Sequence, residues 1–197
     1  MTPAVILAGG ASRRMGGGVK PLLSLAGRPM IEHVVQRLDG QTDIVAINAN
    51  EGDFSSFGMT VIADSFADRP GPLAGILAAL DWAAAQGARD VITLAGDTPF
   101  FPVDLIARLE AGRGDAPAAM AATSENGRLF SHSVFGLWST SLCDGLRSAL
   151  EAGTRKVLHW SEPVGCVLVE FDGRNDPFFN INTPDDLARA EERLVGS

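Results

Sequence analysis

An α/β fold is predicted for this sequence, with a mostly parallel β-sheet covered by helices on both faces. Two observations predict it. Short apolar runs typical of buried strands alternate with segments whose apolar residues recur at helical spacing, which is the pattern of βαβ units. Polar residues that could form a site directly follow the strand runs, and ligands of such sheets gather at the carboxyl ends of the strands. The chain has 197 residues, and we expect a single domain over residues 1–197.

The first half of the chain has the clearer pattern. Strands are expected at residues 4–7, 43–48, 59–64 and 90–97, and helices at residues 30–38, 72–87 and 102–112. Pro29 and Pro102 are assigned to helix starts, because the fixed φ and missing N–H of proline suit the first helical position. Gly87 is assigned as the glycine cap of the second helix.

The second half is less regular. Strands are expected at residues 118–122, 133–137 and 164–171, and helices at 140–152 and 184–195. Thr183 and Asp186 have the spacing of a cap at the start of the last helix. No internal repeat or low-complexity linker divides the chain.

Charge and hydropathy exclude several classes of function. The formal net charge is −8 and the pI is near 4.8, whereas a nucleic-acid-binding protein is usually basic. The sequence has no apolar run of the roughly 18 residues that a membrane span needs, and its first residues lack the pattern of a signal peptide. The two cysteines, Cys143 and Cys166, have no neighbours at metal-binding spacing. We expect a cytoplasmic protein with no nucleic-acid or membrane partner.

The positive charge is concentrated near the start of the chain. Arg13, Arg14, Lys20 and Arg28 fall within 16 residues, in and after a glycine-rich loop that follows the first strand. Glycines let backbone N–H groups approach a phosphate or a base closely, and the basic side chains would attract a small anion. The loop is not a Walker A motif, because Lys20 is followed by proline, and its glycine spacing differs from that of the dinucleotide-binding fingerprint. A flexible surface loop with solvated arginines is the alternative.

Acidic and amide side chains complete the candidate site. Asp97, in LAGDTPF, ends a strand run and could hold Mg²⁺, which prefers oxygen ligands and substrate phosphates; a turn cap is the alternative. Asn180 and Asn182 stand on alternate positions and would point the same way in an extended segment, although capping of the last helix is their alternative role. Asn48 and Asp64 also follow strand runs.

Five motifs lie in order along nearly the whole chain. They are LAGGASRRMGGGVKPLL at residues 7–23, INAN at 47–50, VIADSFADRPGPLAGI at 61–76, GDTPF at 96–100 and NINTPDDLARAE at 180–191. In these motifs the sequence resembles the molybdenum cofactor guanylyltransferase family of the nucleotidyltransferase superfamily. The resemblance implies a Rossmann-like three-layer αβα sandwich. It also implies that GMP moves from GTP to the terminal phosphate of molybdopterin, with Mg²⁺ as cofactor and pyrophosphate as the second product.

The resemblance also assigns roles by position. The implied nucleotide-binding residues are Leu7, Ala8, Gly9, Gly10, Arg13, Lys20, Asn48, Asp64 and Asp97. Lys20, Asp97 and Arg14 are the implied catalytic residues, with Asp97 as the Mg²⁺ ligand. Such a reaction needs no protein nucleophile, because positioning and charge neutralisation accelerate phosphoryl transfer. His33, His132 and His159 stand apart from any nucleophile and are interpreted as structural or solvated.

The acceptor side is less specific. Arg155, Lys156, Asn180 and Asn182 are the candidate contacts to the phosphorylated pterin, and a solvated helix start is the alternative for the first two. Proteins that deliver the cofactor or receive it are further expected partners. The family usually has an acidic residue where this chain has Val19, and a His-Pro pair where it has His132 and Ser133.

Three other functions compete with guanylyl transfer. The same transfer from CTP is made by a sister family, and the LAGG loop favours guanine over cytosine by resemblance. A sugar-phosphate or alditol nucleotidyltransferase is disfavoured by the compact length and the PGPLAG stretch. A non-catalytic nucleotide-binding or cofactor-delivery module is suggested by Val19 and Ser133 but disfavoured by the presence of Lys20 and Asp97.

Overall fold

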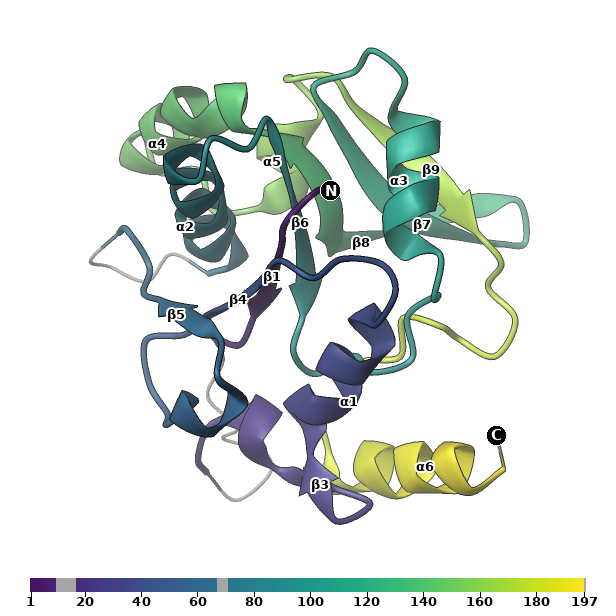
Figure 1. Cartoon of the computed structure of the whole chain (residues 1–197). Helices are drawn as coiled ribbons and strands as arrows, with labels where there is room; N and C mark the ends of the chain where they lie inside the picture. Colours follow the sequence, from purple (N-terminus) through teal and green to yellow (C-terminus); the bar gives the residue numbers. More distant parts are fainter. Residues whose placement is uncertain (10–16, 67–70, 197) are drawn as a thin grey trace.

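The computed structural model of the chain describes residues 1–9, 17–66 and 71–196. Seven strands form one sheet in the order β5-β4-β1-β6-β8-β7-β9 (Figure 1). Their bounds are β1 (Ala4–Leu7), β4 (Val45–Asn48), β5 (Thr60–Ile62), β6 (Asp90–Ala95), β7 (Ala118–Glu125), β8 (Arg128–Ser139) and β9 (Cys166–Phe171). Strand β8 is antiparallel to both of its neighbours, and every other pairing in the sheet is parallel. The predicted α/β class with a mostly parallel sheet is confirmed.

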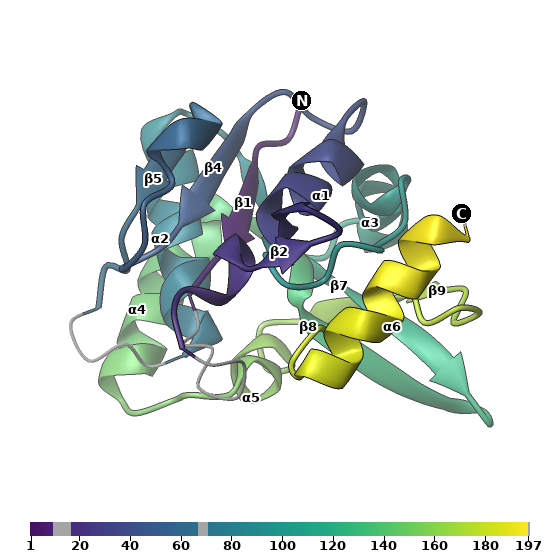
Figure 2. The same ribbon diagram turned by 90° about the horizontal axis from the view of Figure 1, so that it is seen from below.

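Helices cover both faces of the sheet (Figures 1 and 2). They are α1 (Met30–Leu38), α2 (Pro72–Ala85), α3 (Leu105–Arg113), α4 (Cys143–Glu151), α5 (Val157–Ser161) and α6 (Pro184–Val195). The alternation of side chains along β1 explains the two layers. Ala4 and Ile6 belong to a buried cluster with residues of α1 and α3, whereas Val5 belongs to a second cluster with residues of α2, α4 and α5.

Several expected boundaries differ from the structure. Helix α3 begins at Leu105, so the assignment of Pro102 to its start is wrong, and Asp104 precedes the first helical residue instead. Pro29 likewise precedes α1 rather than opening it. The expected helix over residues 140–152 is a short 3₁₀ turn, Thr140–Leu142, followed by α4. Helix α5 and the hairpin of β2 (Ser24–Leu25) and β3 (Arg28–Pro29) were not predicted, because both are too short to show periodicity.

The C-terminal helix packs outside the main sheet. Figure 2 shows α6 alongside β2, and a third buried cluster joins Leu25, Met30, Phe179, Ile181 and Ala190. The predicted cap is confirmed as a full capping box, in which the Thr183 side chain accepts from the N–H of Asp186 and the Asp186 carboxylate accepts from the N–H of Thr183. Through the third cluster, the segment before α6 packs against the N-terminal half of the chain.

Strand β8 bulges where it passes the carboxyl end of β6. Gly136 of β8 pairs with Met120 of β7, but the next aligned pair is Ser131 with Ala122. Residues 132–135 therefore lie opposite Ala121 alone, and bulges of this kind redirect side chains at the ends of sheets.

A buried hydrogen-bond relay supports this bulge. The fully buried Thr93 of β6 donates through Oγ1 to the carbonyl of Val134 at 2.8 Å, and the same Oγ1 accepts from Trp138 Nε1 at 2.8 Å. One hydroxyl thus satisfies two buried groups of β8.

None of the helices in the described ranges combines the length and the apolar character that crossing a membrane requires.

Thr93→Val should lower the free energy of unfolding by about 1–3 kcal/mol, because the indole N–H of Trp138 and the carbonyl of Val134 lose their buried partner without any loss of volume. Urea denaturation measures the effect. Thr93→Ser keeps the hydroxyl and should lose less. A valine variant as stable as the wild type would show that the relay does not stabilise the fold.

Candidate functional site

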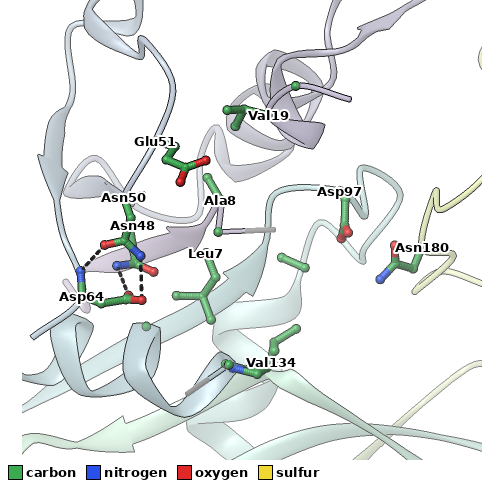
Figure 3. A pocket seen from close by; sticks show the side chains of 16 residues that line it. Leu7, Ala8, Val19, Asn48, Asn50, Glu51, Asp64, Asp97, Val134 and Asn180 are labelled. Carbon is green, nitrogen blue, oxygen red and sulfur yellow. Dashed lines mark hydrogen bonds between the residues drawn. The ribbon is translucent and has the colours of Figure 1, made fainter. Parts of the chain in front are cut away.

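A cavity of about 630 Å³ lies at the carboxyl ends of β1, β4 and β6 (Figure 3). Residues from eight separate segments line it: Leu7, Ala8, Gly9, Gly18, Val19, Asn48, Asn50, Glu51, Asp64, Gly71, Pro72, Gly75, Ala95, Asp97, Val134 and Asn180. Figure 3 shows polar side chains at two ends, with Leu7 and Ala8 between them. Asn48, Asn50 and Asp64 form one end, and Asp97 and Asn180 form the other.

Two asparagines hold the carboxylate of Asp64. Asn48 Nδ2 donates to Asp64 Oδ1 at 2.9 Å, and Asn50 Nδ2 donates to Asp64 Oδ2 at 2.7 Å. The N–H of Asp64 donates back to Asn50 Oδ1 at 2.9 Å, so that the side-chain and backbone positions of Asp64 are both fixed. We call Asn48, Asn50 and Asp64 the amide clamp. In the amide clamp, the carboxylate of Asp64 lies at the cavity wall, and the hydrogen bonds named here come from amide groups rather than from a cationic side chain.

Helix α2 approaches the amide clamp closely at Gly75. A Cβ atom at this position would lie 2.6 Å from Asn48 Oδ1 and 3.1 Å from Leu7 Cδ2. Glycine is thus required here because Asn48 occupies the space that any side chain would need.

Lys20 lies at the other end of the cavity, between three oxygen atoms. Its Nζ donates to Asp97 Oδ2 at 2.5 Å, to Asn182 Oδ1 at 2.6 Å and to Asn180 Oδ1 at 3.0 Å. An ammonium group has three donors and no acceptor, so these contacts use its full capacity. The side chain of Lys20 is 11% exposed and that of Asp97 19% exposed, and a charge buried to this extent needs such partners.

Backbone contacts bring these three segments together. The ring of Pro21 packs against Gly96, the residue before Asp97. A Cβ atom at Gly96 would lie 3.1 Å from Pro21 Cγ, so the absence of a side chain allows this close contact. The N–H of Ile181 donates to the carbonyl of Asp97 at 3.1 Å. Lys20 itself starts a short 3₁₀ helix, Lys20–Leu22, rather than the long helix that follows the phosphate loop in dinucleotide-binding folds.

The oxygen atoms around Asp97 suit a magnesium ion. Mg²⁺ is commonly held by one or two carboxylates together with substrate phosphates and water, and Asp97, Asn180 and Asn182 are all hard oxygen donors. Within residues 1–9, 17–66 and 71–196, no group of three or more His, Cys, Asp or Glu side chains could hold a metal ion.

The structure brings together most of the predicted site residues. Leu7, Ala8, Gly9, Asn48, Asp64, Asp97 and Asn180 line the cavity, and Lys20 and Asn182 join it through Asp97 and Asn180. Gly10, Arg13 and Arg14 lie outside the described residues.

Two of the four predicted acceptor contacts lie away from the cavity. Arg155 and Lys156 are exposed in the turn between α4 and α5 and do not line the cavity, and Arg155 Nη1 donates to the carbonyls of Leu150 and Thr154 at 2.9 Å. Their role in acceptor binding stays a prediction.

Nine cavity-lining residues were not among the predicted site residues: Gly18, Val19, Asn50, Glu51, Gly71, Pro72, Gly75, Ala95 and Val134. Asn50 and Glu51 follow Asn48 after one intervening alanine, and their signal was available in the polar residues after the second strand. Val134 had no sequence signal, because the bulge of β8 is what directs this segment into the cavity.

Of the three histidines, His33 is buried, His132 is partly buried and His159 is exposed. His33 is buried, with Nε2 2.9 Å from the carbonyl of Leu25. His132 stacks on Phe178 with 4.1 Å between ring centroids, and its Nε2 lies 2.9 Å from Thr123 Oγ1. Burial lowers the pKa of His132, and nearby Asp176 opposes this shift only in part, so the ring is neutral at pH 7. His159 is exposed on α5.

Comparison with known proteins gives consistent matches over most of the chain. A family model described as "MobA-like NTP transferase domain" matches residues 4–164. The chain is 45% identical over 196 residues to a molybdenum cofactor guanylyltransferase of Nitrobacter hamburgensis, covering 96% of this chain and 93% of that protein. It is 47% identical over 197 residues to a protein of the same name from Rhodopseudomonas palustris (strain BisB5), covering 96% and 92% of the two chains.

Solved structures share the same fold. The crystal structure of molybdopterin-guanine dinucleotide biosynthesis protein A from Archaeoglobus fulgidus is similar with a TM-score of 0.77, 26% identity and 100% coverage of both chains. A CMP-2-keto-3-deoxy-manno-octonic acid synthetase complexed with CTP has a TM-score of 0.75 but 16% identity, with coverage of 99% of this chain and 98% of that one, and shares the fold alone.

Lys20 and Asp97 should be energetically coupled. Lys20→Met and Asp97→Asn each leave a buried partner without its counter-charge, whereas the double variant leaves neither, so the double-mutant cycle should give a coupling of about 1–3 kcal/mol in the free energy of unfolding. Urea denaturation of the four proteins measures it. The exposed pair of Arg174 and Asp172 is the control and should show a much smaller coupling. Additive effects of the two buried substitutions would contradict a stable pair.

Proposed function

This chain belongs to the MobA-like NTP transferase family, and on that premise we propose that it acts as a molybdenum cofactor guanylyltransferase. The reaction transfers GMP from GTP to the terminal phosphate of molybdopterin and releases pyrophosphate. The observation that carries the proposal is the division of one cavity into the amide clamp at one end and the Lys20–Asp97 pair at the other (Figure 3). A nucleoside triphosphate has the same two-ended chemistry, with a polar base and ribose joined to a charged tail.

The two ends divide the binding of the nucleotide. The amide clamp offers a fixed carboxylate that accepts hydrogen bonds, which suits the N–H groups of a base or the hydroxyl groups of a ribose. Leu7, Ala8 and Gly9 line the path between the ends, and a Cβ at Gly9 would meet no described atom within 4 Å, so a ligand can lie against the backbone there. The triphosphate then extends toward Lys20 and Asp97.

The chemical step is an in-line displacement at the α-phosphorus. A terminal phosphate oxygen of molybdopterin forms the new bond, and the bond from the α-phosphorus to the oxygen of pyrophosphate breaks. Lys20 opposes the negative charge that develops on the leaving pyrophosphate, and Asn180 and Asn182 orient its ammonium group. When bound at Asp97, Mg²⁺ supplies further charge neutralisation and orients phosphate oxygens.

The remaining assignments follow as part of the same proposal. Arg13 and Arg14 add positive charge to the phosphate end, and Arg155 and Lys156 contact the acceptor together with Asn180 and Asn182. The whole chain acts as one nucleotidyltransferase domain, supported by the single sheet that runs from β5 to β9. The protein works in the cytoplasm with protein partners that deliver molybdopterin and receive the product.

Turnover with each nucleotide tests the proposed function. With Mg²⁺ and molybdopterin, pyrophosphate release should be fast with GTP and weak with CTP, ATP and UTP, because the fitted pocket discriminates among bases. Asp97→Asn is the control and should lower the rate by roughly 10²-fold or more. Faster release with CTP would indicate a cytidylyltransferase, and GTP binding without pyrophosphate release would indicate a non-catalytic module.

Gly75→Ala should weaken GTP binding by about tenfold or more, because the new methyl group displaces Asn48 and breaks its contact to Asp64. Isothermal titration calorimetry measures the affinity. Gly145→Ala in α4 is the matched control, since a Cβ there meets nothing within 4 Å and alanine favours helix. If both variants bind GTP equally well, the amide clamp does not contact the nucleotide.

A further inference from the structure

The segment that carries Asn180 and Asn182 begins with an unfavourable turn. Asn175 and Asp176, in the connection from β9 to α6, both have left-handed backbone conformations, with φ of +62° and +43°. Asparagine and aspartate adopt the left-handed conformation more readily than other non-glycine residues, but usually as single residues rather than two in succession. Pro177 follows directly and further restricts the backbone of Asp176. Such a turn persists only where surrounding contacts hold it.

Arg193 supplies those contacts from the last turn of α6. Its Nη2 donates to the carbonyl of Asn175 at 2.6 Å, and its Nη1 donates to the carbonyl of Asp176 at 3.2 Å. One planar guanidinium thus joins both left-handed residues through two different nitrogen atoms held in a fixed fork.

The same guanidinium also contacts two aromatic rings beside the site. It lies 4.0 Å from the ring centroid of Phe100 and 5.6 Å from that of Phe179. Phe100 follows Asp97 by three residues, and Phe179 directly precedes Asn180. Arg193 therefore links the turn to both segments that meet at Lys20.

Two backbone hydrogen bonds connect the turn with the residues at the cavity. The N–H of Phe179 donates to the carbonyl of Asp176 at 3.1 Å, and the N–H of Ile181 donates to the carbonyl of Asp97 at 3.1 Å. Asn180 and Asn182 flank Ile181 and hold the ammonium of Lys20.

We propose that Arg193 is a positioning residue for the phosphate end of the site: it fixes the Asn175–Asp176 turn and so sets Asn180 and Asn182 against Lys20. The effect on turnover rests on the proposed guanylyl transfer. The effect on the backbone does not, and the two are measured separately.

The test compares Arg193→Ala with Arg189→Ala. Arg189 is on the same helix and lies 4.8 Å from the ring centroid of Phe179, and no hydrogen bond joins it to the turn among the described contacts. In hydrogen–deuterium exchange, the amides of Phe179 and Ile181 should lose about tenfold or more of their protection in Arg193→Ala but not in Arg189→Ala. Arg193→Lys keeps the charge without the planar fork and should give an intermediate loss.

Kinetics provide the second readout. Arg193→Ala should lower kcat by about tenfold or more, because misplaced catalytic groups are costly, while KM for GTP stays within about twofold because the amide clamp is at the other end of the cavity. Arg189→Ala should match the wild type in both.

Three outcomes would overturn the proposal. They are unchanged protection of both amides in Arg193→Ala, equal losses in the two alanine variants, and loosened amides with an unchanged kcat. If the wild type itself does not turn over GTP, guanylyl transfer fails, and the exchange measurement alone still decides whether Arg193 holds the turn.

Discussion

The ammonium of Lys20 is the point on which the rest of the site depends. Asp97, Asn180 and Asn182 each give it one oxygen, and these residues come from the end of the central strand β6 and from the segment before α6. A buried ammonium that lacked one of these partners would keep its desolvation cost with fewer compensating contacts, so the three contacts stabilise the meeting of these segments. One charged atom therefore joins the start, the middle and the end of the chain.

The parallel sheet makes this meeting possible. Strands β1, β4 and β6 run in the same direction, and their carboxyl ends deliver Leu7, Asn48 and the loop of Asp97 to one edge. The antiparallel strand β8 adds one wall residue, because its irregular segment passes the end of β6 with Val134 at the cavity, and Thr93 Oγ1 donates a hydrogen bond to the carbonyl of Val134.

Much of this could be predicted from the sequence, for reasons that are local. Strand β1 and helices α1 and α6 have the predicted bounds, because each shows a clear apolar period with a proline or a capping signal beside it. The candidate residues after strands also came together, since strand direction alone sets which edge they share. The β8 bulge and the Asn175–Asp176 turn could not be predicted, because they are held by contacts distant in sequence, from Thr93 and from Arg193. The sequence predicted that Lys20 contacts phosphates. Its hydrogen bonds to Asn180 and Asn182 could not be predicted, because these residues are far from Lys20 in the sequence.

The charge balance of the cavity explains why an acidic protein needs more than its own lysine to hold a nucleotide. Lys20 and Asp97 form a pair without net charge, while Asp64 and Glu51 add carboxylates to the cavity wall. A triphosphate brings several further negative charges, and at an effective dielectric constant of about 20 two unit charges 4 Å apart still repel by about 4 kcal/mol. The Lys20–Asp97 pair cannot offset this repulsion by itself. In the proposed reaction, a divalent cation at Asp97 would change the charge of the Lys20–Asp97 pair together with its ion from zero to two positive charges. Under the proposed function, the Lys20–Asp97 pair would for this reason position the phosphates together with a metal ion rather than attract the nucleotide by itself.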